Sequence, residues 1–123
     1  MTRSEFVEKY QRIMERVLQC SKKTRMEGLL AWEGELDREK IAARDIFEYG
    51  LSFVLDGTDA VIIDEILSNI INQEKDEQLR VLMNIQKKAV LCIQQGMAPR
   101  LLYPLLNSYT DIPLNEDKFK AEF

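Results

Sequence analysis

The chain has 123 residues, of which 46% are hydrophobic and 31% charged, and its net charge at pH 7 is −4. This length is typical of one domain, and the composition is typical of a globular protein and not of a disordered or fibrous one. Nucleic-acid binding needs a basic face, which the interleaved charges do not provide. The chain has no histidine, so the commonest general base and metal ligand is missing.

The cysteines and the apolar segments favour a cytoplasmic protein. Cys20 and Cys92 lie far apart, inside apolar periodic segments. Cysteines in such positions are usually small buried apolar residues. The alternative is that the two form a disulfide or a redox pair. No signal peptide opens the chain, and no apolar run approaches the roughly 18 residues that cross a bilayer. We expect a protein that does not span a membrane and has no catalytic residue, metal or cofactor.

Apolar residues at helical spacing predict a long first helix. Thr2 and Glu5 have the spacing of a capping box, in which each side chain binds the backbone amide of the other residue. Apolar residues then recur three and four positions apart over residues 6–20. We expect this helix to continue to about Glu33, a length of roughly 45 Å.

A second helix is predicted over residues 38–55. Gly50 within it would let a neighbouring helix approach closely, because glycine has no side chain. Asp56, Gly57 and Thr58 are expected to form a structural turn after this helix. Gly57 is free to adopt a positive φ, and Thr58 is suited to cap the helix that follows.

A third helical pattern begins at residue 59 and crosses the polar stretch at residues 72–78. The sequence leaves open whether this is one long helix or two. Gly96 is suited to end the pattern, and Pro99 is suited to the first turn of a short last helix that ends near residue 107. Pro104 inside that helix predicts a bend or a restart.

These elements predict an all-α fold. We expect a small bundle of three to four helices, two of them long, with a short bent helix at the C-terminal end. Residues 1–110 would form a single domain and residues 111–123 a tail whose path the sequence does not give.

The segment FVLDGTD, residues 53–59, raises an enzymatic alternative. It resembles the φφφDxDGT motif of haloacid-dehalogenase phosphatases, in which the first aspartate attacks phosphorus. Asp56 would take the place of the second aspartate, whereas Val54 takes that of the first and cannot act as a nucleophile. The preceding run also has helical spacing, whereas the motif needs a strand. We keep this phosphatase only as a remote alternative.

Three segments resemble another family. They are KKTRMEGLLAWE at residues 22–33, YGLSFVLDGTD at residues 49–59 and IQQGMAPRLLYPLLNSY at residues 93–109. In this order they are similar to RxxGLLALE and GLxLVVDGTD in the cytoplasmic loop of the flagellar stator subunit MotA, and to the IQxGxNPRxLxxKLxSYL tail of that subunit. The MotA family is related to the ExbB and TolQ proteins. The resemblance implies the cytoplasmic part of a stator subunit.

The chain also departs from this family. The four membrane helices of MotA-like proteins are missing, and with them the proton path and the surface for the partner MotB. Trp32 stands where the family has leucine, Ala98 where it has asparagine, and Pro104 is an addition. We therefore expect no proton conduction from this chain.

The resemblance also implies a partner-binding site. The loop of MotA meets the rotor protein FliG through charged residues that fall, by motif, on Arg25 and Glu33. On a helical wheel Arg25 and Glu33 lie on either side of Leu29, about 80° apart around the helix axis and about 12 Å apart along it. Met26 falls on the same side of the helix as Leu29. We hypothesise that Met26 and Leu29 form an exposed apolar patch with a charged rim. The alternative is that neighbouring helices cover the patch.

The expected function is therefore that of a non-catalytic interaction protein that binds a FliG-like rotor protein or a MotA-like stator subunit. The alternative is a soluble regulator or assembly chaperone of a full-length MotA-like protein. The sequence leaves open whether the chain forms a homo-oligomer and whether it is a truncated piece of a longer protein.

Overall fold

The computed structural model describes all 123 residues and contains helices but no strands. The all-α prediction is confirmed, but the expected count of three to four helices is not matched. None of the helices combines the length and the apolar character that crossing a membrane requires. There are six α-helices and two 3-10 helices: α1 (Arg3–Glu27), η1 (Leu29–Glu35), α2 (Ile46–Leu55), α3 (Ala60–Ile71), α4 (Glu77–Gln94), α5 (Pro99–Asn107), α6 (Glu116–Phe119) and η2 (Lys120–Glu122).

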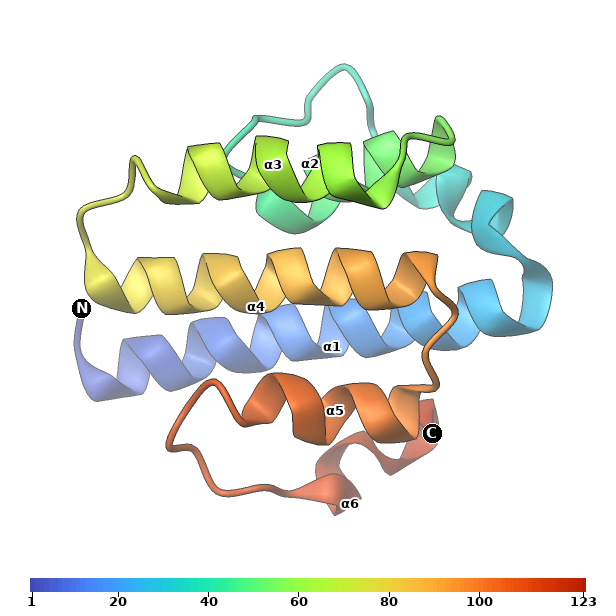
Figure 1. Ribbon diagram of the computed structural model, residues 1–123. Helices are drawn as coiled ribbons and strands as arrows, with labels where there is room; N and C mark the ends of the chain where they lie inside the picture. The colour runs from blue at the N-terminus through green and yellow to red at the C-terminus, as the bar shows by residue number, and fades with distance from the viewer.

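The two long helices, α1 and α4, lie side by side in the middle of the molecule (Figure 1). Helices α2 and α3 pack on one side of α4, and α5 packs against both long helices on the other side. One apolar core of 25 buried residues joins these layers, with Leu18 of α1, Ile85 of α4 and Leu102 of α5 fully buried. The long helices therefore form the scaffold on which the shorter elements are placed.

Helix α1 begins as predicted but ends earlier. The Thr2 hydroxyl accepts a hydrogen bond from the Glu5 amide, and the Glu5 carboxylate accepts one from the Thr2 amide, which completes the capping box. The prediction of a helix to Glu33 was wrong, because Gly28 has a φ of +94° and ends the α-helix. The chain folds back as η1, and Trp32 is buried with its ring 4.7 Å from the Arg16 guanidinium carbon.

Helix α2 begins at Ile46, so its predicted start at residue 38 was wrong. Residues 38–45 form turns on the surface, where Arg38 is engaged in ion pairs and no apolar stripe favours a helix. The close approach expected at Gly50 is confirmed. A Cβ atom there would lie 2.8 Å from a Val90 methyl carbon of α4. Helix α2 is therefore held tightly against α4.

The polar stretch at residues 72–78 separates two helices, which answers the question that the sequence left open. Helix α3 ends at Ile71. The Asp76 carboxylate accepts hydrogen bonds from the amides of Gln78 (2.9 Å) and Leu79 (3.2 Å), and so caps the start of α4.

Helix α5 agrees with the sequence at both ends. Pro99 occupies its first turn and Asn107 its last position, as predicted. The α5 helix is continuous through Pro104, so the expectation of a restart was wrong. Proline removes one backbone donor, whose acceptor would be the carbonyl of Arg100. Arg100 is exposed, so water can take the place of that donor.

The tail folds back onto the bundle. Phe119 is buried, and its ring centroid lies 4.9 Å from that of Tyr103 in α5. The Asn115 amide donates to the Tyr103 hydroxyl at 2.9 Å, and the Lys22 ammonium donates to the Ala121 carbonyl at 2.7 Å. The tail thus lies beside α5, near the C-terminal half of α1 (Figure 1).

Candidate functional site

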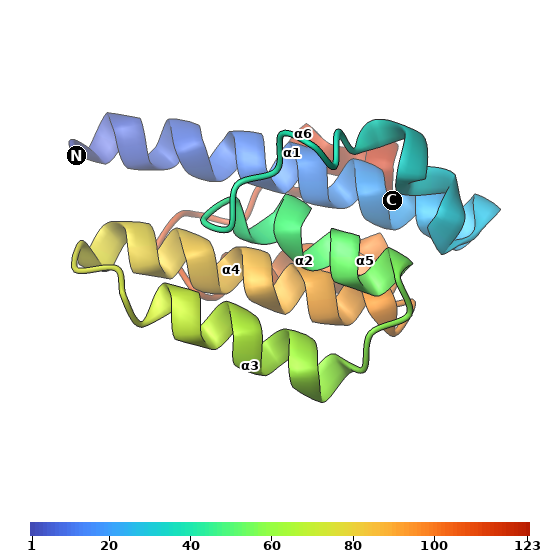
Figure 2. The same ribbon diagram turned by 90° about the horizontal axis from the view of Figure 1, so that it is seen from above.

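Three chain reversals lie at one end of the bundle. Figures 1 and 2 place the α1–η1 junction, the α2–α3 turn and the α4–α5 turn on the same side of the molecule in two perpendicular views. We call this the junction end and define it by residues 25–30, 56–59 and 95–98. Each of the three segments singled out in the sequence, at residues 22–33, 49–59 and 93–109, contributes one of these reversals. Segments far apart in the sequence therefore meet at the junction end.

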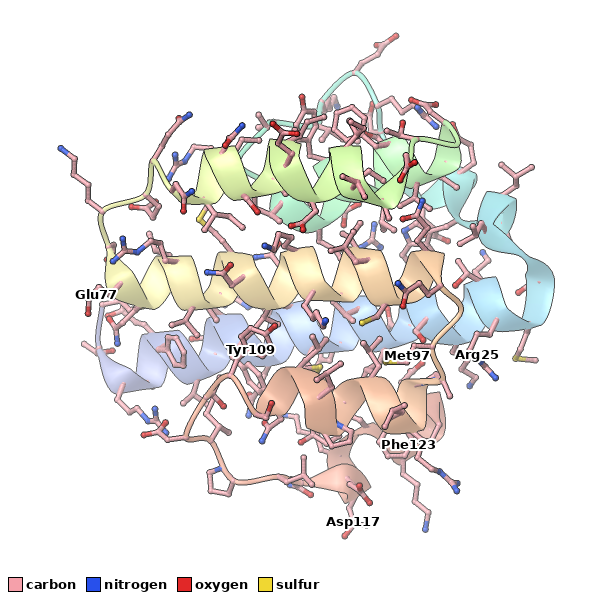
Figure 3. The ribbon with its side chains drawn as sticks, viewed as in Figure 1. Arg25, Glu77, Met97, Tyr109, Asp117 and Phe123 are labelled. Carbon is pink, nitrogen blue, oxygen red and sulfur yellow. The ribbon has the colours of Figure 1, made fainter.

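Polar contacts join the first reversal to the third. Arg25, near the end of α1, donates a hydrogen bond to the carbonyl oxygen of Gly96, after α4. The Ser21 hydroxyl donates to the Met97 carbonyl at 3.2 Å. Figure 3 shows Arg25 and Met97 at this end of the molecule. Gly96 has a φ of +79°, which ends α4 and turns its carbonyl region toward α1.

The second reversal is the Asp56-Gly57-Thr58 turn. Gly57 has a φ of +78° and its amide donates to the Val54 carbonyl at 3.0 Å, while the Thr58 amide donates to the Phe53 carbonyl at 3.0 Å. These are the bonds that end α2. The expected cap at Thr58 was misplaced by one residue. The carboxylate of Asp59 caps α3, by accepting a hydrogen bond from the Val61 amide at 3.0 Å.

Gln94 of α4 joins this second reversal to the third. Its side-chain amide nitrogen donates to the Thr58 carbonyl at 2.9 Å. The Gln94 side-chain oxygen is buried without a partner, as is the indole nitrogen of Trp32. This hydrogen bond joins the turn to the last residue of α4.

Arg38 connects the turn to η1. Its guanidinium makes two hydrogen bonds to the Glu33 carboxylate, at 2.7 and 2.9 Å, and one to the Asp56 carboxylate, at 2.8 Å. The hydrogen bonds from Arg38 hold the pKa of Glu33 below its usual range, and the same bonds raise the pKa of Arg38. The sequence did not single out Arg38, because its two partners lie in other elements.

The predicted patch is exposed only in part. Met26 is 74% exposed, whereas Leu29 is half-buried and packs against the core. Leu30, which is 73% exposed, takes the place expected for Leu29. The difference arises at Gly28, since a chain that leaves the α-helix no longer follows the angular positions of a helical wheel. The same break separates Arg25 from Glu33, which is bound to Arg38.

Beyond the residues that define the junction end, the first turns of α3 and α5 expose apolar side chains that the sequence did not indicate. Val61 is 72% and Ile62 48% exposed at the start of α3, and Leu101 is exposed in the first turn of α5. Both α3 residues belong to a continuous apolar run, in which the sequence alone does not separate the core face from the outer face. Helices α3 and α5 pack on opposite sides of α4, and single exposed apolar residues such as these are common on protein surfaces.

Val54 of the phosphatase-like segment and both cysteines are buried. No cluster of three or more histidine, cysteine, aspartate or glutamate side chains forms a metal-binding group. Val54, where the phosphatase motif needs its nucleophile, is buried in α2 and not at the tip of a strand. Burial raises the pKa of the Cys20 thiol to about 12, and also raises that of Cys92, so both thiols keep their protons at neutral pH.

Comparisons of the chain with protein-family models, with curated proteins and with solved structures gave no match. The resemblance to the MotA family therefore stands on the three sequence segments alone.

Proposed function

We propose that this chain is a non-catalytic interaction protein of a bacterial flagellar motor, and that it binds a rotor or stator protein through the junction end. The observation that carries the proposal is the meeting of the three MotA-like segments at one end of the bundle, where Arg25 and Gln94 bridge them. The helices that hold the three segments in place contribute their buried side chains to one apolar core.

Apolar contacts supply most of the binding in this proposal. Burying a side chain such as Met26 or Leu30 contributes about 1.5–3 kcal/mol. An exposed ion pair contributes only about 0.2–1 kcal/mol. Arg25 and the Glu33–Arg38 pair therefore set the orientation and choice of partner more than the affinity, and their effect weakens as the salt concentration rises.

The proposed site corrects the sequence hypothesis in its membership. It comprises Met26 and Leu30 as the apolar centre, Arg25 and Glu33 as charges at its edge, and Arg38 as the residue that holds Glu33. We place the protein in the cytoplasm, where the rotor and the stator loop are accessible. In this proposal the protein binds a partner and forms no proton channel.

Co-purification tests the proposal and distinguishes the two classes of partner. Tagged protein is purified from a flagellated bacterium after membrane extraction, and the purified fraction is tested for FliG-like rotor proteins and for MotA-like subunits. Capture of the rotor protein supports a role in the motor. Capture of the stator subunit alone supports the regulator or assembly chaperone. Arg25→Glu and Glu33→Lys, singly and together, should reduce capture, and Lys40→Glu in the exposed loop serves as the matched control. Unchanged capture by the double variant would overturn the proposal.

A further inference from the structure

A groove runs between α1 and the segment that leads into α2, away from the junction end. Helices α1 and α2 both pack on α4, but they make few contacts with each other. A cavity of about 380 Å³ lies between α1, the first half of α4 and residues 44–45, and one of about 280 Å³ beside it extends to Phe47 and Glu48 of α2. Arg12, Ile13 and Arg44 line both cavities, so the two form one continuous groove.

The floor of the groove is apolar. It consists of Leu79, Leu82 and Met83 from α4, with Ile13 of α1 beside them. Leu82 and Met83 belong to the core, whereas Ile13 and Leu79 are only half-buried and keep part of their apolar surface in contact with water. An occupant with an apolar face would remove that surface from water.

The rim is more basic than the chain as a whole. Lys9, Arg12, Arg16 and Arg44 face three acidic residues, Asp45, Glu48 and Glu74, in a protein of net charge −4. Arg16 is held by Glu48 through hydrogen bonds of 2.8 and 3.2 Å, and Arg44 is paired with Glu74. Arg16 of α1 and Arg44 before α2 are therefore engaged in ion pairs, and Lys9 and Arg12 are the other two basic residues of the rim.

Those two others are available to a partner. Lys9 makes no ion pair. Arg12 pairs only with Glu8, four residues earlier on the same helix, and both side chains are more than 60% exposed. Pairs of this kind are weak, so Arg12 can turn to another carboxylate at small cost. On the opposite side, Asp45 makes no ion pair and disfavours negative charge there.

We propose that this groove binds an amphipathic helix of a partner protein, with its apolar face on the α4 floor and an acidic flank against Lys9 and Arg12. The wall from Lys9 to Arg16 extends about 10 Å, or two helical turns. Helix-in-groove recognition uses apolar anchors three and four residues apart, which this length accommodates. Asp45 fixes the orientation, because it repels an acidic flank placed on the α2 side.

This groove is separate from the junction end. Arg12 and Arg25 lie on the same helix about 20 Å apart along its axis. Both surfaces can therefore be occupied at once, and the protein would then bridge two partners. The inference stands independently of the proposed function of the junction end.

The test uses the full chain and three fluorescein-labelled synthetic helices of about four turns. The first has a leucine face and glutamate on one flank, the second has the same leucine face with lysine in place of glutamate, and the third has the glutamate flank with alanine in place of leucine. Fluorescence anisotropy measures their binding. We expect the first peptide to bind at least tenfold more tightly than either of the others.

Two protein variants locate the binding site. Lys9→Glu breaks no ion pair and should weaken binding of the first peptide about threefold to tenfold, while Lys40→Glu makes the same change of charge outside the groove and should leave binding unchanged. Leu30→Glu at the junction end should also leave it unchanged. Equal binding of the acidic and basic peptides, no binding of the first peptide, or full binding by Lys9→Glu would each overturn the proposal.

Discussion

At the scale of single residues, Gly50 sets how closely α2 approaches its neighbours. A Cβ atom there would lie 2.8 Å from a Val90 methyl carbon and 3.0 Å from a Leu67 methyl carbon. Gly50→Ala should therefore overpack the α2–α4 contact at a cost of about 1–3 kcal/mol, which exceeds the gain of about 0.5–1 kcal/mol in helix propensity. Urea unfolding followed by circular dichroism measures the difference.

Gly34→Ala is the matched control for this prediction. A Cβ atom at Gly34 meets nothing within 4 Å, and its φ is not positive. The variant should unfold within about 0.5 kcal/mol of the unaltered protein. Equal stability of the Gly50→Ala and Gly34→Ala variants would show that α2 does not approach α4 as described.

Buried titratable groups predict a loss of stability at alkaline pH. Burial raises the pKa of Cys20 from 9.0 to about 12, and burial also raises the pKa of Tyr10. The unfolded chain releases the thiol proton above about pH 9 and the phenol proton above about pH 10, while the folded chain retains both, so unfolding becomes more favourable as the pH rises. The urea midpoint should fall between pH 9 and pH 12.

Cys20→Ala tests the share of the thiol in this effect. The variant should show a shallower fall of the urea midpoint with pH, while the contribution of Tyr10 remains. A midpoint that does not change from pH 9 to pH 12, or a variant with an unchanged slope, would contradict the raised pKa of the buried thiol.

At the scale of single elements, the start of α3 distinguishes two neighbouring residues. The Asp59 carboxylate caps the helix through the Val61 amide, and the Thr58 side chain does not. Asp59→Ala should lower the free energy of unfolding by about 1 kcal/mol, whereas Thr58→Ala should change it by less than about 0.5 kcal/mol. If thermal or urea unfolding showed a larger loss of unfolding free energy for Thr58→Ala than for Asp59→Ala, Thr58 and not Asp59 would be the cap of α3.

The sequence predicted elements best where the signals are local. The capping box at Thr2 and Glu5, the glycine reversal at Gly96 and the proline start at Pro99 each depend on a few adjacent residues, and each is present in the structure. The polar stretch at residues 72–78 was recognised as a weak joint for the same reason.

The sequence failed where distant contacts decide. A glycine can lie inside a helix, so Gly28 by itself does not predict a helix end. The helix ends there because the chain folds back through η1 and Trp32 is buried against Arg16. The late start of α2 was also missed, because residues 38–45 form surface turns in which Arg38 pairs with Glu33 and Asp56. Such pairings cannot be obtained from periodicity alone.

At the scale of the whole molecule, the long helices bring three separated reversals to one end. The turn at Asp56-Gly57-Thr58 could be predicted from its own residues, but its contact with Gln94 could not. The structure gives the exposure of the residues in the predicted patch, and their role in binding stays a prediction. Arg25 and Met26 lie at the junction end and are exposed, Leu29 is half-buried, and Leu30 is an addition from the structure.

The most direct test of the junction end compares two leucines. Leu30 is 73% exposed at this end, and Leu114 is 49% exposed in the segment between α5 and α6. Affinity for the purified rotor or stator partner is measured by biolayer interferometry for Leu30→Glu and Leu114→Glu. We predict that Leu30→Glu weakens binding tenfold or more while Leu114→Glu leaves it unchanged. Equal affinities for both variants and the unaltered protein would contradict partner binding at the junction end.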